Sequence, residues 1–451
     1  YELSADGKKI LVRKDDTLAV FDASADKVDL AEKKVDTSGW RFAIDPREEW
    51  RQMFREAWRL ERDYFYDRRM NGVDWPAMRA KYEPLVELVA DRAELSDLLG
   101  QMIGELSALH MFVYGGDSRK GPDDVEPASL GAELARDEAA GGYRVAHVYR
   151  SDPDYPDRLS PLAAPGVEVK DGDVIQAING VPALSVADPD ELLRDQGGRQ
   201  VLLHVASGGA TRDVVAVPIS PERAADLRYD EWEYTRRLRV DEAGKGEIGY
   251  VHLRAMTRAD WTEWAREFYP VFRRAGLIVD VRHNRGGNID SWILEKLLRR
   301  AWFYWQPRVG DTYWNMQYAF RGHVAVLIDQ NTASDGEAFA EGIRRLGLGK
   351  LLGARTWGGE IWLSSSNFLV DKGIATAAET GVFGPEGEWL IEGHGVDPDI
   401  AVDDLPAATF VGADAQLDAA VRYLQDLIRR EPVPTPNPPP YPNKAFVPGP
   451  R

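Results

Sequence analysis

The fold of this chain is decided by residues 323–362, HVAVLIDQNTASDGEAFAEGIRRLGLGKLLGARTWGGEIW. Residues 324–328 form an apolar, β-branched run that predicts a buried strand, and from Glu337 the apolar residues recur with a helical period. Ser334 lies where the predicted strand gives way to the helix. A serine at such a turn is exposed near unpaired backbone N–H groups and the positive end of the helix dipole. Because these groups can hold an oxyanion, Ser334 is a candidate nucleophile.

A structural role for Ser334 is the alternative. Serine and threonine are preferred at the N-cap of helices, where the side chain accepts a backbone N–H, and Thr332 lies in the same turn. The local pattern therefore fits a capping residue as well as a nucleophile. The choice depends on what the rest of the chain brings to this turn.

A strand, a glycine-rich loop and a helix also occur earlier in the chain. Residues 277–281 are apolar, residues 282–288 read RHNRGGN, and a helical pattern follows over residues 289–300. This repetition predicts an α/β domain with crossover connections that place the two loops side by side. Gly286 and Gly287 carry no side chain, so their backbone N–H groups can approach a ligand closely. A phosphate-binding loop is the rival interpretation, but the segment has neither a Gly-Lys-Ser/Thr sequence nor GxGxxG spacing.

The composition restricts the classes of function. The 451 residues are enough for about three domains, and hydrophobic and charged fractions of 44% and 29% are typical of a globular protein. The net charge of −18, without a dense basic patch, argues against a nucleic-acid or anionic membrane partner. No apolar run is long enough to predict a membrane span. The chain contains no cysteine, which excludes a disulfide, a thiolate nucleophile and a thiolate zinc site.

The first part of the chain divides into short strands and a helical region. Residues 9–13 and 17–21 predict two strands, which cannot form a stable sheet alone. We interpret residues 1–40 as the closing strands of a β-propeller blade, whose other blades would either precede this chain or be absent. Apolar stripes with a helical period then predict a helical subdomain over residues 41–125. His110 follows its last predicted helix directly.

Residues 126–220 have the character of a small β domain. Their centre, GVEVKDGDVIQAINGVPA at residues 166–183, resembles a PDZ domain, in which strands joined by Asp-Gly and Asn-Gly turns surround a peptide groove. Ser129, Leu130 and Gly131 then match the loop whose N–H groups receive a peptide carboxylate or extend a bound strand. A β domain that only packs against its neighbours is the alternative.

A serine nucleophile needs a base at neutral pH, and histidine is the usual one. The sequence offers seven candidates, His110, His147, His204, His252, His283, His323 and His394. Those in predicted strands are more typical of structural histidines, namely His147, His204, His252 and His323. Spacing alone does not choose among the remaining three.

Five blocks occur in an order that resembles tricorn protease and its bacterial homologues. They are GELSALH at residues 104–110, the PDZ-like segment, DVRHNRGGN at 280–288, ASDGEAFAEGIRRLGLGKLLGARTWGG at 333–359, and EGHGVDPDI at 392–400. The resemblance covers almost the whole chain. It depends on the order of the blocks, since no single block is unique.

The resemblance implies a catalytic set that is distributed over two domains. By motif, Ser334 is the nucleophile, His110 is the general base, and Glu392 is the carboxylate that orients the histidine. The backbone N–H groups of Gly287 and Asp335 form the implied oxyanion hole. The resemblance implies neither a metal ion nor a cofactor.

The resemblance also implies an α+β multidomain fold. A helical bundle subdomain and the PDZ-like domain would accompany an α/β catalytic domain at residues 221–430, which has a crotonase-like βα core. A proline-rich, extended tail would follow at residues 431–451. The implied activity is that of a serine peptidase that hydrolyses short peptides, already cut by an upstream protease, through an acyl-enzyme. The implied assembly is a homo-oligomer, a hexamer by resemblance, in the cytoplasm or, alternatively, in the periplasm or outside the cell.

Two positions depart from the family. Leu109 stands where the family has a serine that links the histidine to the glutamate, and a leucine side chain cannot relay a hydrogen bond. Either another hydroxyl such as Ser107 or a water molecule replaces it, or the histidine is poorly oriented. Trp305, in YWQPR, stands at the position of an acidic specificity residue. We therefore expect an aromatic-lined pocket, with Trp305 and Gly286 among the substrate-binding residues.

Two other functions stay open. A carboxy-terminal processing protease uses a Ser–Lys dyad whose lysine ends a Thr-Phe-Gly-Lys motif, and here Gly359 takes the place of that lysine. This mechanism is therefore disfavoured. A catalytically weak or inactive homologue that binds peptides is the second alternative, and the leucine at position 109 is its main support.

Overall fold

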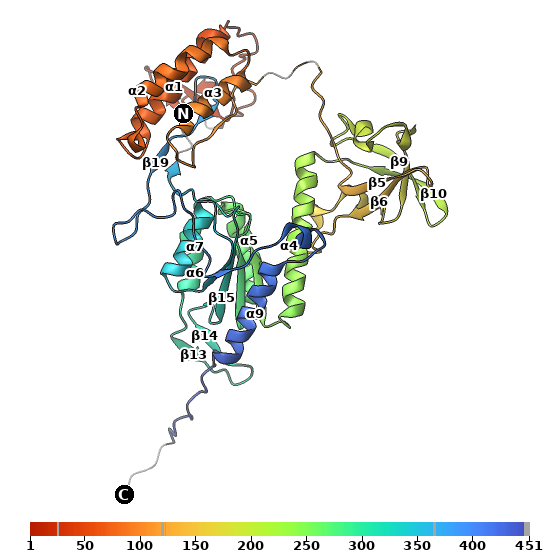
Figure 1. Cartoon of the computed structure of the whole chain (residues 1–451), viewed down its shortest axis with the longest axis vertical. Helices are drawn as coiled ribbons and strands as arrows, with labels where there is room; N and C mark the ends of the chain where they lie inside the picture. Colours follow the sequence, from red (N-terminus) through yellow and green to blue (C-terminus); the bar gives the residue numbers. More distant parts are fainter. Residues whose placement is uncertain (25–26, 119–120, 122, 364–366, 446–451) are drawn as a thin grey trace.

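The computed structural model describes residues 1–24, 27–118, 121, 123–363 and 367–445. Figure 1 shows a helical part that carries the N-terminal strands, a small β domain, and an α/β part that connects them. The last six residues of the predicted proline-rich tail lie outside the described part, and its earlier residues form neither helix nor strand.

The N-terminal strands form a three-stranded antiparallel sheet in the order β1-β2-β3. Its strands are β1 (Glu2–Leu3), β2 (Lys9–Lys14) and β3 (Thr17–Asp22). The last two strands coincide with the two that the alternating sequence predicts.

The helical part is built from three helices and two 3-10 turns. They are α1 (Pro46–Tyr64), η1 (Met70–Gly72), α2 (Trp75–Tyr82), η2 (Glu83–Leu88) and α3 (Arg92–Gly104). An aspartate caps each α-helix by accepting backbone N–H groups of the first turn, which ends the preceding loop sharply. In the core, the indole N–H of Trp58 donates to the carbonyl of Trp75 at 3.0 Å, and the indole of Trp75 returns a bond to Trp58 at 2.9 Å. The segment that follows α3 and carries His110 therefore starts from a well-packed core.

The small β domain has one main sheet with the order β10-β9-β7-β6-β5, and β8 pairs with β7 at the side. Its strands are β5 (Ala132–Asp137), β6 (Gly142–Val148), β7 (Val174–Ile178), β8 (Val181–Pro182), β9 (Val201–Ser207) and β10 (Ala210–Ala216). Its 3-10 turns are η3 (Pro156–Arg158), η4 (Pro161–Ala163), η5 (Ala183–Ser185) and η6 (Pro189–Leu193). All strand pairs are antiparallel, and β5 is an edge strand. The edge of β5 is thus free to pair with another extended segment.

The α/β part has a five-stranded parallel sheet with the order β11-β12-β15-β16-β20. Its strands are β11 (Ile248–His252), β12 (Gly276–Asp280), β15 (His323–Ile328), β16 (Lys350–Gly353) and β20 (Ile400–Ala401). Its helices are α4 (Pro221–Ala243), α5 (Arg258–Val271), α6 (Asp290–Leu298), α7 (Asp335–Arg345), α8 (Pro406–Phe410) and α9 (Ala415–Arg430). The hairpin β13 (Phe303–Trp305) and β14 (Tyr313–Asn315) lies between α6 and β15 in the chain. The predicted strand–loop–helix units are therefore present.

Helices cover both faces of this sheet. Successive residues of β12 point to opposite faces, so Leu277 and Val279 pack in one core with α5, α6 and α7, whereas Ile278 packs in the other with α4 and α9. Buried on both sides, the sheet holds the carboxyl ends of β12 and β15 side by side. Loops at that edge are the usual place for a ligand site in α/β proteins.

A small strand pair joins the helical part to the α/β part, and a second pair lies beside it within residues 362–380. β4 (Val113–Tyr114), which follows His110, pairs with β18 (Ile374–Ala375), and β17 (Trp362–Leu363) pairs with β19 (Ala378–Thr380). The backbone N–H of Tyr66 also donates to the carbonyl of Ala378 at 2.8 Å. Four residues that follow β16 in the chain thus pack in the core of the helical part, namely Ile361, Leu369, Ala375 and Ala378. They bring the segment after α3 next to the α/β part (Figure 1).

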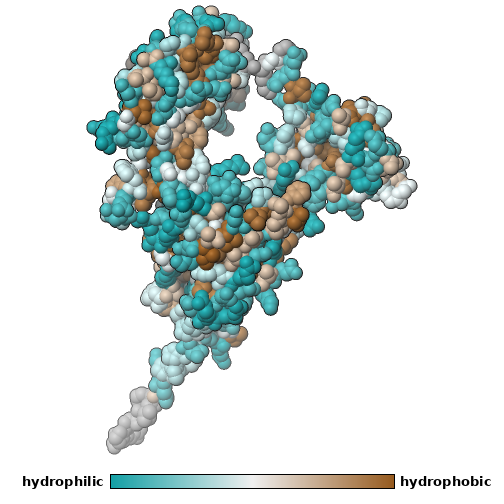
Figure 2. All heavy atoms as spheres, viewed as in Figure 1, coloured by the Kyte–Doolittle hydropathy of each residue, from teal (hydrophilic) through white to brown (hydrophobic). Residues whose placement is uncertain are grey.

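The surface in view is mostly hydrophilic, with apolar residues in scattered patches over the helical and α/β parts (Figure 2). No helix in the described part of the chain combines the length and the apolar character that a bilayer crossing requires.

Candidate functional site

Ser334 immediately precedes α7, at the carboxyl end of β15, and its backbone has the unusual angles φ 55° and ψ −127°. A positive φ is strained for a serine, and such strain persists only where surrounding contacts hold it. Here the N–H of Ser334 donates to the carboxylate of Glu337 at 3.0 Å, and its carbonyl accepts the N–H of Glu337 at 2.7 Å. The serine is thus fixed on a sharp strand-to-helix turn.

The glycine loop after β12 touches this serine. A Cβ atom at Gly286, where φ is +79°, would lie 2.4 Å from the Cβ of Ser334, and one at Gly287 would lie 1.9 Å from the carbonyl oxygen of Met256. Both positions therefore require glycine. Asn284 joins the two loops. Its main-chain carbonyl accepts the N–H of Ala333 at 2.8 Å, and its side-chain amide donates to the carbonyl of Leu253 at 2.8 Å.

Two backbone N–H groups next to Ser334 have no acceptor among the described residues, those of Gly287 and Asp335. The N–H of Asp335 belongs to the first turn of α7, where the helix dipole favours negative charge. The carboxylate of Asp335 points elsewhere, since it accepts the N–H groups of Ile289 at 2.6 Å and Asp290 at 3.0 Å. Burial and the charge of Asp290 raise the pKa of Asp335 to about 7. The two free N–H groups can bind an oxyanion.

His110 approaches the serine from the helical part. Its ring is 6% exposed and packs edge-on against Trp357, with ring centroids 5.3 Å apart. Burial lowers the pKa of His110, and the negative charge of Glu392 and a backbone contact with Ile361 act in the opposite direction. The neutral ring, which is the form a general base needs, is therefore favoured.

Glu392 contacts the segment before His110 through the main chain. One carboxylate oxygen accepts the N–H of Leu109 at 3.1 Å, and the other accepts the N–H groups of Glu360 at 2.8 Å and Ile361 at 3.2 Å. The Nδ1 atom of His110 is buried without a hydrogen-bond partner among the described residues. Glu392 therefore lies next to the histidine but does not bond to its ring.

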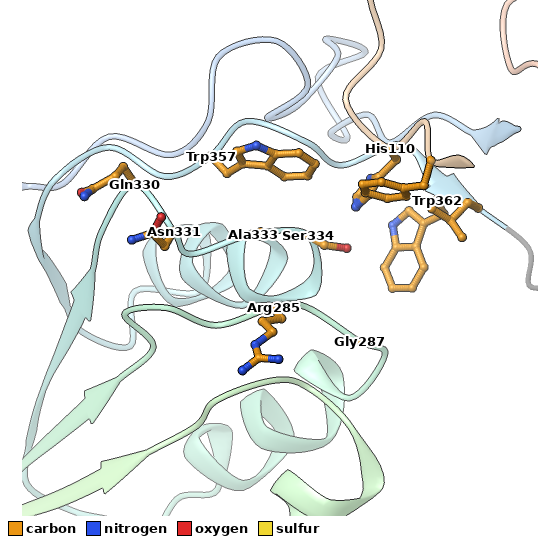
Figure 3. Close-up of a pocket in the computed structure, with 11 residues that line it drawn as sticks. His110, Arg285, Gly287, Gln330, Asn331, Ala333, Ser334, Trp357 and Trp362 are labelled. Atoms are coloured by element: carbon orange, nitrogen blue, oxygen red, sulfur yellow. The ribbon is translucent and has the colours of Figure 1, made fainter. Parts of the chain in front are cut away.

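Ser334 and His110 line one cavity of about 520 Å³. Figure 3 shows the Ser334 hydroxyl directed toward the side of this cavity where His110 and Trp362 lie. No direct hydrogen bond joins the two side chains in the part of the chain that the structure describes. The cavity is lined by His110, Phe112, Arg285, Gly287, Gln330, Asn331, Ala333, Ser334, Trp357, Trp362 and Leu363. Side chains from both parts of the molecule thus converge on the candidate nucleophile.

The other histidines do not line this cavity. Each has a polar partner: His147 with Glu231, His204 with Asp213, His252 with Tyr229, His283 with Asn331, His323 with the carbonyl of Glu431, and His394 with Asp397. Of these partners, Asn331 lines the cavity, and its side chain lies between the cavity and His283. The four strand histidines are therefore structural, as their pattern predicts.

The expected aromatic walls come from residues other than Trp305. Phe112, Trp357 and Trp362 supply them, and sequence reasoning missed all three. Trp305 lies on the β13–β14 hairpin and stacks on Tyr313 with centroids 4.9 Å apart. The structure does not bring Trp305 to the cavity, because α6 carries the chain from the carboxyl edge of the sheet to the opposite end (Figure 1). The expectation that Trp305 lines this pocket is corrected accordingly.

The PDZ-like loop lines a separate groove. A cavity of about 360 Å³ lies between β5 and η6, and Ser129 and Leu130 form one end of it. The N–H of Ser129 is already bonded to Ile219 at 2.8 Å, and that of Gly131 to the hydroxyl of Ser129 at 3.1 Å. Gly131 packs against α4, since a Cβ there would lie 2.9 Å from the side chain of Leu227. The loop thus offers the groove fewer free N–H groups than the sequence suggests.

A metal centre finds no support in the side chains that the structure describes, which contain no group of three or more His, Asp or Glu residues arranged to hold an ion. The groups at or beside the cavity that can take part in acyl transfer are a hydroxyl, an imidazole and two backbone donors, and the polar side chains of Arg285, Gln330 and Asn331 also line it.

Three family models match this chain. Residues 46–104 match the tricorn protease C1 domain, residues 128–221 match the tricorn protease PDZ domain, and residues 247–402 match peptidase family S41. The models follow one another in the order of the helical part, the small β domain and the α/β part.

Curated relatives and a solved structure show the same similarity. Tricorn protease homolog 1 of Streptomyces coelicolor is 37% identical over 447 residues, which are 97% of this chain and 41% of that protein. The putative tricorn-like protease C-terminal subunit of Sulfurisphaera tokodaii is 36% identical over 430 residues, 93% of this chain and 49% of that protein. The crystal structure of the tricorn protease superposes with a TM-score of 0.85 at 30% identity, covering 95% of this chain and 41% of that one. The chain spans two-fifths to about half the length of these relatives, and it belongs to the tricorn protease family.

Proposed function

We propose that this chain forms a serine peptidase site in which Ser334 is the nucleophile and His110 is the general base. The observation that carries the proposal is their meeting at one cavity from two separate parts of the fold. A serine on a strained turn, a neutral imidazole and two free N–H donors are the parts that acyl transfer needs.

In the proposed reaction, His110 takes the hydroxyl proton as Ser334 attacks the peptide carbonyl. The developing oxyanion is held by the N–H groups of Gly287 and Asp335. The protonated His110 then gives its proton to the leaving amine, and the acyl-enzyme forms. A water molecule, activated by the same imidazole, releases the second product. The charge of Glu392 stabilises the imidazolium.

The proposed substrates are short peptides, already cut by an upstream protease. The aromatic walls of the cavity favour an apolar side chain next to the scissile bond. The free edge of β5 is proposed to hold an extended stretch of the same peptide, with Ser129 and Leu130 lining its groove and Gly131 following them in the same loop. Gly286 acts by its lack of a side chain, which leaves room for Ser334.

The finer features of the family are proposed for this chain as well. They include the predicted domain boundaries, a crotonase-like core in the α/β domain, and propeller-like N-terminal strands. They also include assembly into a homo-oligomer, with six subunits by resemblance, and a cytoplasmic location with export as the alternative.

The two alternatives receive less support. A Ser–Lys dyad needs a lysine at the nucleophile, and none of the described residues that line the cavity is a lysine. An inactive peptide-binding homologue would not require the buried imidazole beside a strained serine. A fluorophosphonate probe tests the difference, because only a competent nucleophile is phosphonylated. We expect labelling at Ser334 that the Ser334→Ala substitution abolishes. Absence of labelling in the parent protein, with peptide binding retained, would favour the inactive homologue.

A further inference from the structure

Glu337 has the most heavily bonded carboxylate near the candidate site. Its side chain is 0% exposed in the first turn of α7, and each oxygen accepts two hydrogen bonds. One oxygen accepts the N–H of Ser334 at 3.0 Å and that of Gly359 at 3.0 Å. The other accepts the hydroxyl of Thr356 at 2.5 Å and the N–H of Gly358 at 2.7 Å. All four partners are donors, so the arrangement fits the ionised carboxylate.

These bonds join two separate segments. One donor is the backbone of Ser334, and the other three belong to residues 356–361, which we call the strap. Within the strap, Trp357 packs edge-on against the His110 ring with centroids 5.3 Å apart. The strap is also held at its other end, where Glu360 and Ile361 donate their N–H groups to Glu392.

A continuous path of contacts therefore runs from nucleophile to base. Glu337 fastens the start of the strap to the backbone of Ser334, and Glu392 fastens its end to the N–H of Leu109, next to His110. The strap is one of the connections at this place, since the hydroxyl of Thr376 also donates to the carbonyl of His110 at 3.1 Å. The strap is the connection that contacts both the backbone of the nucleophile, through Glu337, and the ring of the base, through Trp357.

We propose that Glu337 is a positioning residue for the peptidase reaction, which sets the place of Ser334 relative to the strap and, through Trp357, relative to His110. The inference rests on the proposed function. A capping role for the helix explains only one of the four bonds, the one from Ser334. The three bonds to the strap have no part in capping α7.

The test compares Glu337→Gln with Glu337→Asp and with Glu341→Gln. Glutamine keeps the shape but replaces one acceptor oxygen by an NH₂ group that faces donors. Aspartate keeps the charge but is one methylene shorter. Glu341 lies on the same helix and pairs with Arg345 at 2.7 Å, away from the strap, so it controls for any general effect on α7.

We expect Glu337→Gln to lower kcat about a hundredfold, the scale of loss for a misplacement of about 1 Å, with KM changed less than about threefold. The rate of fluorophosphonate labelling at Ser334 should fall in parallel. Glu337→Asp should recover part of the loss, and Glu341→Gln should keep the parent kcat. A folded Glu337→Gln protein with a kcat within about twofold of the parent would overturn the inference.

A second pair of variants covers the case in which Glu337→Gln does not fold. Thr356→Val removes one donor to Glu337, whereas Thr356→Ser retains the hydroxyl. We expect a kcat loss of about tenfold for the valine variant and near-parent activity for the serine variant. Equal activity of the valine and serine variants would contradict the positioning role of Glu337. If the parent protein itself shows neither labelling nor hydrolysis, the proposed function fails, and this inference falls with it.

Discussion

A carboxylate oxygen of Glu392 accepts the backbone N–H of Leu109 at 3.1 Å. The carboxylate thus reaches the residue before His110 without any side chain in between. The leucine at position 109 leaves this contact intact, because every residue type except proline supplies the same N–H. What the leucine does not supply is a partner for the buried Nδ1 atom of His110.

The substitution Leu109→Ser should therefore raise kcat/KM. A hydroxyl at this position can hydrogen-bond to the ring of His110, which becomes charged in the transition state. Such a bond stabilises the transition state by about 1 to 3 kcal/mol, which corresponds to a gain in kcat/KM of about tenfold to a hundredfold. The leucine side chain is 39% exposed, so its loss should cost little stability. Peptide hydrolysis and melting temperature are the two measurements.

Ser107→Ala is the matched control for this prediction. Ser107 is exposed and has no side-chain hydrogen bond among the described residues, so its alanine variant should keep the parent rate. A Leu109→Ser protein that is no faster, together with a much slower Ser107→Ala protein, would mean that Ser107 carries the relay.

The pH profile should have its acid limb below the ordinary histidine value near 6.5. Burial lowers the pKa of His110, so the neutral base persists to more acidic pH. The charge of Glu392 opposes this shift, so Glu392→Gln should move the limb further toward acid and also reduce kcat. A kcat/KM titration over about pH 4 to 9 checks both statements, and a limb that moves upward in the variant would contradict them.

Ser334→Ala should abolish hydrolysis while the protein still folds, since a residue at a helix start contributes at most about 2 kcal/mol as a cap. His110→Ala should be nearly as damaging. Because a nucleophile and its base act together, the double variant should be little worse than either single variant. Single-turnover rates measure this, and additive losses would show that the two residues act separately.

Glu61 should make stability fall as the pH rises. This side chain in α1 is 0% exposed, and neither carboxylate oxygen has a partner among the described residues. Burial and the charge of Glu379 raise its pKa to about 9. In the folded protein this carboxyl group stays neutral up to its raised pKa, whereas in the unfolded chain it ionises above the ordinary value near 4.5. The free energy of unfolding therefore falls as the pH rises above that value, by about 4 kcal/mol at pH 7.5.

Glu61→Gln removes this ionisation. The variant should gain melting temperature relative to the parent at about pH 8 and much less at about pH 5. Thermal denaturation at both pH values is sufficient. A difference between variant and parent that does not change with pH would mean that Glu61 is not buried in its neutral form.

The elements that carry Ser334 could be predicted because the pattern that forms them is local. Residues 324–328 are apolar enough to be buried on both faces, and the helical period begins where α7 begins. The glycine loop was recognisable for the same reason. The choice of His110 among seven histidines was not local, because it depends on how the helical part packs against the sheet, and only the family resemblance indicated it.

The strap and the cavity walls could not be predicted from the sequence. Trp357 packs against His110, and the strap that carries it is hydrogen-bonded to Glu337. These contacts join residues that are far apart in the chain and follow no helical or strand period. Trp305 was misplaced because its sequence context says nothing about which end of the sheet α6 reaches. Three-dimensional packing decides both cases.

The two candidate catalytic side chains belong to parts of the chain that are made at different times. The helical part with His110 leaves the ribosome first, and the turn with Ser334 follows only after the whole small β domain. A chain whose synthesis has stopped before residue 334 has the imidazole without the hydroxyl, and a full-length chain whose two parts have not docked has both but does not hold them at one cavity. The candidate site is thus complete only once the helical part has docked on the α/β part.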